Sequence, residues 1–156
     1  MQKVMMVACT LAGLAVYVTV ASSAEDLVAA VKERRHLMKD IVGPAAKLGN
    51  QMVKGDVSFD AGKATKAMND INGVPDKYVT LFPKGTEHGA IADSEAKPAI
   101  WEDFDKFKAT AAKLKDASAK AAGAAAQGKD AFGAAFTDMT KVCKECHETF
   151  REKVER

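Results

Sequence analysis

One short run constrains this chain of 156 residues more than any other segment: Cys143-Lys144-Glu145-Cys146-His147. Two cysteines three positions apart share one face of a helix, and an imidazole follows directly. Covalent attachment of a c-type haem requires this pattern, in which both sulfurs bond one porphyrin and His147 is the proximal ligand of the iron. A redox-active cysteine pair does not need the histidine, and no second Cys or His pair stands at a spacing typical of zinc sites. The run therefore predicts one covalently bound haem c.

The first 24 residues have the pattern of a secretory signal peptide. Lys3 precedes an apolar stretch at residues 4–20, and the small residues Ala21 to Ala24 follow it. Cleavage after Ala24 removes the third cysteine, Cys9, and leaves one mature domain, residues 25–156, in the periplasm. The alternative is an uncleaved membrane anchor, because an apolar stretch of about 17 residues is close to the shortest length that spans a bilayer. We expect cleavage, and therefore no stable membrane anchor in the mature protein.

The composition favours helices and argues against nucleic acid as a partner. The formal net charge is +2, which is too small to indicate a nucleic-acid-binding surface. Aromatic residues make up only 6% of the chain and alanine is abundant, which is typical of closely packed helices rather than of a sheet. The mature length suits a single domain with its own core.

Apolar residues that recur every three or four positions predict four helices. These helices are expected over residues 25–54, 58–72, 98–126 and 129–154. The longest connection, residues 82–97, contains Pro and Gly and is expected to be a loop. Because the other connections are short, the predicted fold is all-α, an antiparallel up-down-up-down four-helix bundle with haem c on its last helix.

The first two helices allow more detailed predictions. A single inward stripe is expected along the first helix, formed by Leu27, Val31, Arg34, Met38, Ile41, Ala45, Leu48 and Met52. Pro44 removes an amide donor and crowds the carbonyl of Asp40, so we expect a kink there. Ser58 is the expected cap of the second helix.

The segment from Cys143 to Arg151, Cys-x-x-Cys-His-x-x-Phe-Arg, resembles the tail of the class II cytochromes c, the cytochrome c′ family. Other small cytochromes c carry the haem motif near the start of the chain. Three further segments agree with this family: residues 31–34 through Met38, the loop around Phe82-Pro83 and Gly85-Thr86, and Ala99-Ile100-Trp101. The resemblance covers essentially all of the mature chain and implies a four-helix bundle with one covalent haem.

The resemblance also implies roles for residues around the haem. In this family an Arg on the first helix is followed four residues later by the side chain over the distal haem face, which implies these places for Arg34 and Met38. In the low-spin members, of the cytochrome c-556 type, that side chain is a ligating Met, and the run around Met38 resembles this type. Arg34 is expected to pair with a haem propionate and Arg151 to lie near the proximal side. His36 and His88 are rival distal ligands that we do not expect to reach the iron.

Two hypotheses about function follow from these roles. If His147 and Met38 both bind the iron, the protein is a periplasmic one-electron carrier that exchanges electrons with redox partner proteins. If Met38 only packs over the haem, the protein is a five-coordinate, high-spin cytochrome that binds NO or CO. We do not expect an enzyme, because Leu37 and Met38 offer no polar group that helps to cleave a peroxide bond. A monomer and a homodimer are both compatible with the sequence.

Overall fold

The computed structural model describes residues 23–153, and this part of the chain is mainly helical. Its elements are α1 (Ala24–His36), the π-helical turn η1 (Leu37–Val42), α2 (Gly43–Lys54), α3 (Ala61–Asn72), α4 (Pro75–Tyr78), the 3₁₀ turn η2 (Val79–Leu81), α5 (Ala99–Glu102), α6 (Phe104–Ala125) and α7 (Lys129–Phe150). The expected signal peptide, residues 1–24, falls outside the described residues except for its last two positions.

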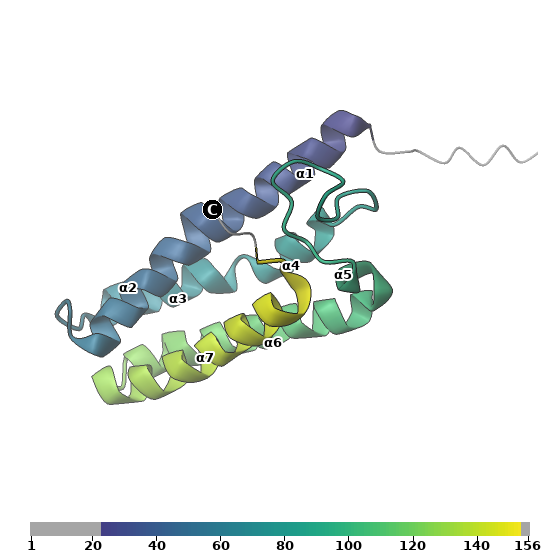
Figure 1. Ribbon diagram of the computed structural model, residues 1–156. Coiled ribbons are helices and arrows are strands. Elements are labelled where there is room, and N and C mark those ends of the chain that lie inside the picture. The colour runs from purple at the N-terminus through teal and green to yellow at the C-terminus, as the bar shows by residue number, and fades with distance from the viewer. Residues whose placement is uncertain (1–22, 154–156) are drawn as a thin grey trace, which may run out of the picture.

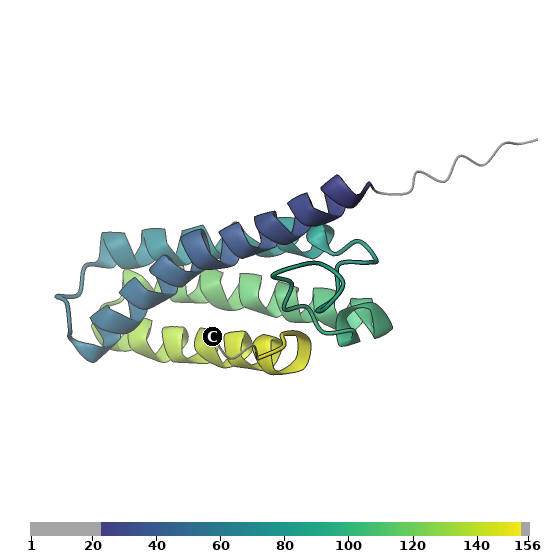
Figure 2. The ribbon, with the colours of Figure 1, turned by 45° about the horizontal axis from the view of Figure 1, so that its top comes forward.

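The long helices form an antiparallel four-helix bundle, as the sequence predicts. Figures 1 and 2 show α1, η1 and α2 as one continuous rod, with α3, α6 and α7 running alongside it. Helix α6 packs against both α3 and α7, and α2 contacts both of the same helices. The short helices α4 and α5 and the loop between them lie together at one end of the bundle (Figure 1). Within residues 23–153, no helix has the length and apolar character that a membrane span requires.

Aspartate caps determine where two of the helices begin. The Asp60 carboxylate accepts a hydrogen bond from the backbone N–H of Lys63 at 2.9 Å, so α3 begins after Asp60 and the expected cap at Ser58 is wrong. Asp103 leaves the helical region, with φ −140° and ψ 74°, and caps α6 through the N–H of Lys106 at 2.9 Å. The helix predicted over residues 98–126 is therefore divided into α5 and α6.

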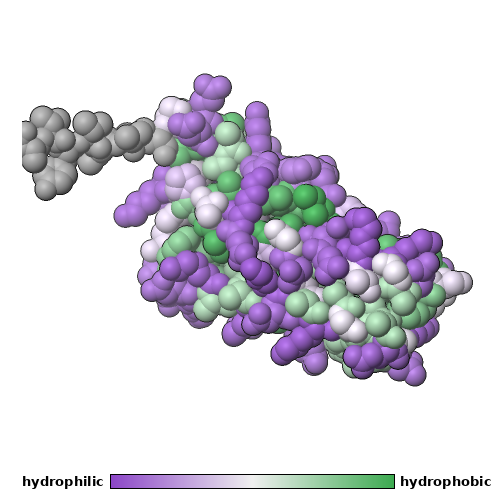
Figure 3. All heavy atoms as spheres, turned by 180° about the vertical axis from the view of Figure 1, so that it is seen from behind, coloured by the Kyte–Doolittle hydropathy of each residue, from purple (hydrophilic) through white to green (hydrophobic). Residues whose placement is uncertain are grey.

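The main hydrophobic core lies in the half of the bundle remote from α4 and α5. Its buried members are Ala45, Met52, Ala64, Ala67, Met68, Ile71, Ala121, Ala122, Ala125, Phe132, Phe136 and Met139. The alanines of α6 carry small side chains, so α3 and α7 approach that helix closely. Figure 3 shows that hydrophilic side chains cover most of the face opposite to Figure 1, with hydrophobic ones visible chiefly near its middle.

The rod formed by α1 and α2 is interrupted by the π-helical turn at Leu37–Val42. Here the backbone N–H of Gly43 bonds to the carbonyl of Met38, five residues earlier, instead of the usual four. Pro44 has no N–H, and its ring crowds the carbonyl of Asp40 in a regular helix. The irregularity predicted at Pro44 therefore takes the form of a wide turn just before it.

This wide turn changes which residues of the first helix are buried. The prediction of one unbroken stripe is wrong at Met38, which is only half-buried, whereas the half-buried Leu48 packs against the main core as expected. Leu37, which is 5% exposed, and Gly49 take the buried positions. The turn contains one extra residue, so the positions that face the core change register between α1 and α2.

Candidate functional site

The last two turns of α7 carry the Cys-x-x-Cys-His run. Cys143 and Cys146 are free, half-buried thiols that lie on one face of the helix. Burial raises the pKa of the Cys143 thiol. Burial, followed by the neighbouring Cys143 and Glu145, raises the pKa of Cys146 to about 11. Both thiols are therefore neutral near pH 7.

His147 follows directly, and its side chain keeps contact with solvent. Partial desolvation, and then the positive charge of Arg151, lower the pKa of its imidazole, while Glu95 opposes this effect. The neutral imidazole, which is the form that binds metals, is favoured as a result. Within residues 23–153, no group of three or more His, Cys, Asp or Glu side chains is arranged to hold a metal ion by itself.

A second hydrophobic cluster, which we call the aromatic cluster, stands next to Cys146. Its buried members are Phe82, Ala96, Ile100, Phe107 and Phe150, and the partly buried Tyr78, Val79, Leu81, Ala99, Trp101, Phe104 and Cys146 pack against them. The rings of Phe82 and Phe107 meet edge to face with centroids 4.7 Å apart. The indole N–H of Trp101 donates to the carbonyl of Phe82 at 3.0 Å, which agrees with a packing role for this residue.

Arg34 is buried, with 5% exposure, and connects α1 to the loop at residues 82–97. Its Nη1 donates to Thr86 Oγ1 at 3.3 Å, and its Nη2 donates to Thr86 O at 3.0 Å and to Ser94 Oγ at 3.3 Å. Its guanidinium carbon lies 4.3 Å from the centroid of the Phe82 ring. Three of its five N–H groups therefore bond the loop, through Thr86 and Ser94, to which the sequence analysis assigned no role.

Tyr78 connects the Arg34 region electrostatically with the end of α7. Burial, followed by the effect of Cys146, raises its pKa to about 12, and Arg34 and Arg151 oppose this rise. Arg34 on α1 and Arg151 after α7 thus both act on one phenol, although they are far apart in the sequence. Sequence reasoning missed Tyr78; the available signal was an aromatic residue just after the Gly73-Val74-Pro75 break.

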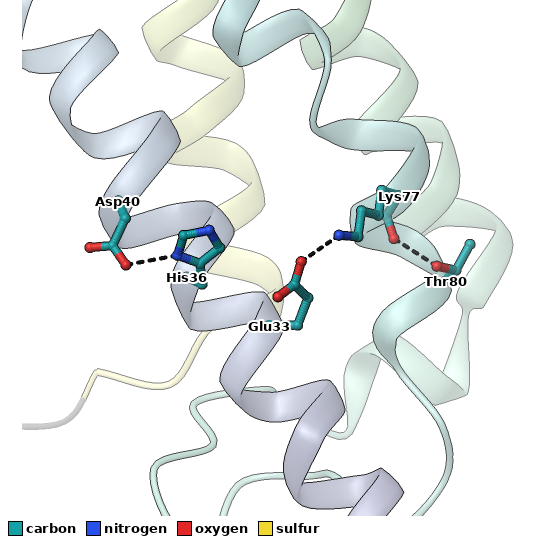
Figure 4. A network of polar contacts seen from close by, with 5 residues as sticks. All are labelled: Glu33, His36, Asp40, Lys77 and Thr80. Atoms are coloured by element: carbon teal, nitrogen blue, oxygen red, sulfur yellow. Dashed lines mark hydrogen bonds and ion pairs between the residues drawn. The ribbon is translucent and has the colours of Figure 1, made fainter.

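The half-buried Met38 lies in η1, one turn after Arg34, so these two residues share a face of the rod. The rival histidines have other contacts. Figure 4 shows the ring of His36 turned toward Asp40, whose Oδ2 lies 2.9 Å from Nδ1. The ring of His88 has its Nδ1 at 2.8 Å from the carbonyl of Ser94.

A groove of about 450 Å³ lies elsewhere, between the outer face of α1 and the turn at residues 90–93. Lys32 and Arg35 line it, and Arg35 pairs with Asp93 at 2.6 Å. Neither Met38 nor any residue of the Cys-x-x-Cys-His run lines this groove. It is therefore separate from the candidate site.

Comparison with known proteins adds independent information to this geometry. The family model described as Cytochrome C′ matches residues 29–151, which is most of the chain and includes every candidate site residue. The chain belongs to the cytochrome c′ family. As a family member it binds one covalently attached haem c, and haem proteins of the cytochrome c type are electron carriers or gas binders.

Three relatives illustrate the range of this family. Cytochrome c-554 of Cereibacter sphaeroides is 34% identical over 134 residues, which is 85% of this chain and 87% of the relative. Cytochrome c-556 of Agrobacterium fabrum is 37% identical over 124 residues, 79% of this chain and 81% of the relative. The nitric oxide complex of a mutant cytochrome c prime from Alcaligenes xylosoxidans has a TM-score of 0.68 and 30% identity, covering 80% of this chain and 94% of that one.

Proposed function

We propose that Cys143 and Cys146 hold haem c through two thioether bonds and that His147 is the proximal ligand of the iron. Each thiol adds across one vinyl group, so that an S–C bond forms and the thiol hydrogen passes to the second vinyl carbon. The residues present suit this group, because two free thiols lie one turn apart beside an aromatic cluster that matches an apolar macrocycle. The neutral imidazole of His147 adjoins them.

The function that this arrangement supports best is one-electron transfer with His147 and Met38 as the two axial ligands. The observation that carries this proposal is the position of Met38: it is half-buried and shares a face with Arg34, whose guanidinium lies 4.3 Å from the ring centroid of Phe82, a member of the aromatic cluster against which Cys146 packs. When bound, haem c supplies a one-electron redox couple, and a thioether opposite an imidazole favours its reduced state.

The remaining residues of the site exclude water and supply positive charge next to the proposed haem. The aromatic cluster shields the side of the site next to Cys146 from solvent. Arg34 has two N–H groups beyond those that bond Thr86 and Ser94, and we assign these to a haem propionate. Arg151, which is exposed, provides a positive charge on the proximal side beside His147.

The same proposal places the protein in the periplasm, where it exchanges electrons with other redox proteins. Lys3, the apolar stretch at residues 4–20 and the small residues before Glu25 support export followed by cleavage after Ala24. Attachment of haem to the Cys-x-x-Cys-His run then takes place in the compartment that the leader specifies.

The second candidate function is the binding of NO or CO at an open distal position. One finding favours it: the similar cytochrome c prime from Alcaligenes xylosoxidans has been solved as a nitric oxide complex. In this case Met38 packs over the haem without ligating the iron, and it forms part of an apolar pocket for a small neutral gas.

The absorption spectrum of the reduced holoprotein distinguishes the two functions, with Met38→Leu as the decisive variant. Leucine keeps the size of Met38 but has no sulfur, so packing is preserved while ligation is lost. If Met38 ligates, the wild type shows a sharp low-spin α band and reacts slowly with CO, and both Met38→Leu and Met38→Ala become high-spin. A broad high-spin wild-type spectrum that Met38→Leu leaves unaltered would contradict electron transfer with Met38 as ligand and support gas binding.

A further inference from the structure

The orientation of α1 about its own axis is fixed by contacts outside the rod. Arg34 is bonded to Thr86 and Ser94 in the loop. Glu33 forms an ion pair with Lys77 of α4, as Figure 4 shows, and the Glu33 pKa is lowered first by this hydrogen bond. These contacts hold one face of α1 against the loop at residues 82–97 and another against α4.

The orientation of α2 is fixed separately, by the main core. Ala45 and Met52 are buried members of that core. Gly49 lies against the ring of Phe136, and a Cβ added to Gly49 would come within 3.0 Å of Phe136 Cδ2. The side of α2 that carries these three residues cannot turn away without opening the core.

A regular α-helix would not keep Leu37 and Ala45 on one line of the helix surface. Leu37 and Ala45 are both buried and lie eight residues apart, which in a regular helix places them about 80° out of line. Met38 lies seven residues before Ala45, and in a regular helix it falls within about 20° of it. A regular helix anchored at Ala45 would therefore bury Met38 in the place that Leu37 occupies.

We propose that the π-helical turn η1 is the element that turns Met38 out of the core stripe and toward the haem, and that Gly43 and Pro44 are the positioning residues that maintain it. The inference rests on the proposed place of Met38 over the distal haem face. Pro44 cannot donate the hydrogen bond that would close a regular turn onto Asp40. Gly43 permits the wide closure, because a Cβ there would lie only 3.2 Å from the carbonyl oxygen of Met38.

The double variant Gly43→Ala/Pro44→Ala tests this inference in the holoprotein. The first substitution adds a methyl group that crowds the wide closure, and the second restores an N–H that can bond the Asp40 carbonyl, so both changes favour a regular helix. A crystal structure is expected to show Met38 buried in place of Leu37. The absorption spectrum of the reduced holoprotein is expected to change in the same way as that of Met38→Ala. Lys47→Ala, an exposed change on α2, is the matched control and leaves both readouts unchanged.

Deletion of the exposed Lys39 from the double variant provides a rescue. The deletion shortens the interval from Leu37 to Ala45 to seven residues, so a regular helix brings both onto the core face and returns Met38 to the haem side. The shortened variant is therefore expected to regain the wild-type spectrum, which a general loss of stability would not allow. The inference is overturned if the double variant keeps the wild-type burial of Leu37 and Met38. It is also overturned if the deletion of Lys39 does not restore that burial.

The failure of the proposed ligation is distinguishable from the failure of this inference. If Met38→Leu leaves the wild-type spectrum unchanged, ligation by Met38 is wrong. The role of the turn is then decided by the crystal structures alone, because the exchange of burial between Leu37 and Met38 does not depend on an iron–sulfur bond.

Discussion

Arg34 donates hydrogen bonds to both the side-chain hydroxyl and the main-chain carbonyl of Thr86, so one buried guanidinium fixes a helix and a loop at once. Lysine has no planar fork and cannot reproduce this pattern. We expect Arg34→Lys to lower the free energy of unfolding of the holoprotein by about 2 kcal/mol, because buried acceptors lose their donors. Urea unfolding followed by circular dichroism measures this loss.

The neighbouring Arg35 is the control for this prediction. It pairs with Asp93 at 2.6 Å, and about a third of its side chain is exposed. Arg35→Lys is expected to change the free energy of unfolding by less than about 0.5 kcal/mol, as is usual for surface ion pairs. Equal effects of the two substitutions would show that the buried hydrogen bonds of Arg34 have no special importance.

The contact between Gly49 and Phe136 predicts that a single methyl group disrupts the main core. A Cβ at Gly49 would lie 3.0 Å from Phe136 Cδ2 and closer still to Cε2, so the ring has to move. We expect Gly49→Ala to destabilise the protein by about 1–3 kcal/mol through overpacking. Gly123→Ala, where no atom lies within 4 Å of the added Cβ, should instead stabilise it by about 0.5–1 kcal/mol. Thermal unfolding of both variants checks the opposite signs.

The raised pKa of Tyr78 predicts that the folded protein loses stability at high pH. This pKa is raised to about 12, chiefly by burial, whereas an unfolded tyrosine titrates near pH 10. The folded state holds the phenol proton more tightly, so this contribution to stability is fully present below about pH 10 and is lost as the pH rises toward 12. Two pKa units correspond to about 2–3 kcal/mol.

The variant Tyr78→Phe isolates this effect, since it lacks the titrating group. The difference in unfolding free energy between wild type and Tyr78→Phe should fall by about 2–3 kcal/mol between about pH 9 and about pH 12. The only other tyrosine is Tyr17 in the expected signal peptide, so the difference in tyrosinate absorbance between wild type and Tyr78→Phe reports the ionisation of Tyr78. Ionisation of Tyr78 near pH 10 in the folded protein would contradict the prediction.

The start of α1 predicts a difference between precursor and mature chain. Ser23 Oγ accepts a hydrogen bond from the N–H of Asp26 at 3.2 Å, and the Asp26 carboxylate accepts one from the Ser23 N–H at 3.0 Å. Cleavage after Ala24 removes this capping box, and the pKa of Asp26, which the Ser23 side chain lowers, returns toward its usual value. Intact-mass measurement of the periplasmic protein should show Glu25 as the first residue, and NMR should show faster amide exchange in the first turn than in an uncleaved chain.

Periodicity and motif spacing predicted the architecture because both are local properties of the chain. The buried Ala64, Met68 and Ile71 of α3 follow directly from the three- and four-residue pattern. The start of α3 was harder to predict, because Ser58 and Asp60 are both good caps and only the three-dimensional path of the chain selects between them.

The details that the sequence did not reveal depend on long-range contacts. The partners of Arg34 are Thr86 and Ser94, which lie in a loop without any period, so no sequence pattern connects them to α1. The wide turn before Pro44 is another example. A stripe through Met38 looks regular in the sequence, but the π-helical turn buries Leu37 together with Ala45 instead.

Helix α7 belongs to both hydrophobic clusters: Phe132 and Phe136 lie in the main core, and Phe150 lies in the aromatic cluster. The first half of the helix is thus held in place by packing against other protein side chains. Cys143 and Cys146, the proposed points of haem attachment, follow the last residue of α7 in the main core, and Cys146 packs against the aromatic cluster. A single helix therefore joins the part of the molecule that is packed by protein side chains to the proposed attachment site of the haem.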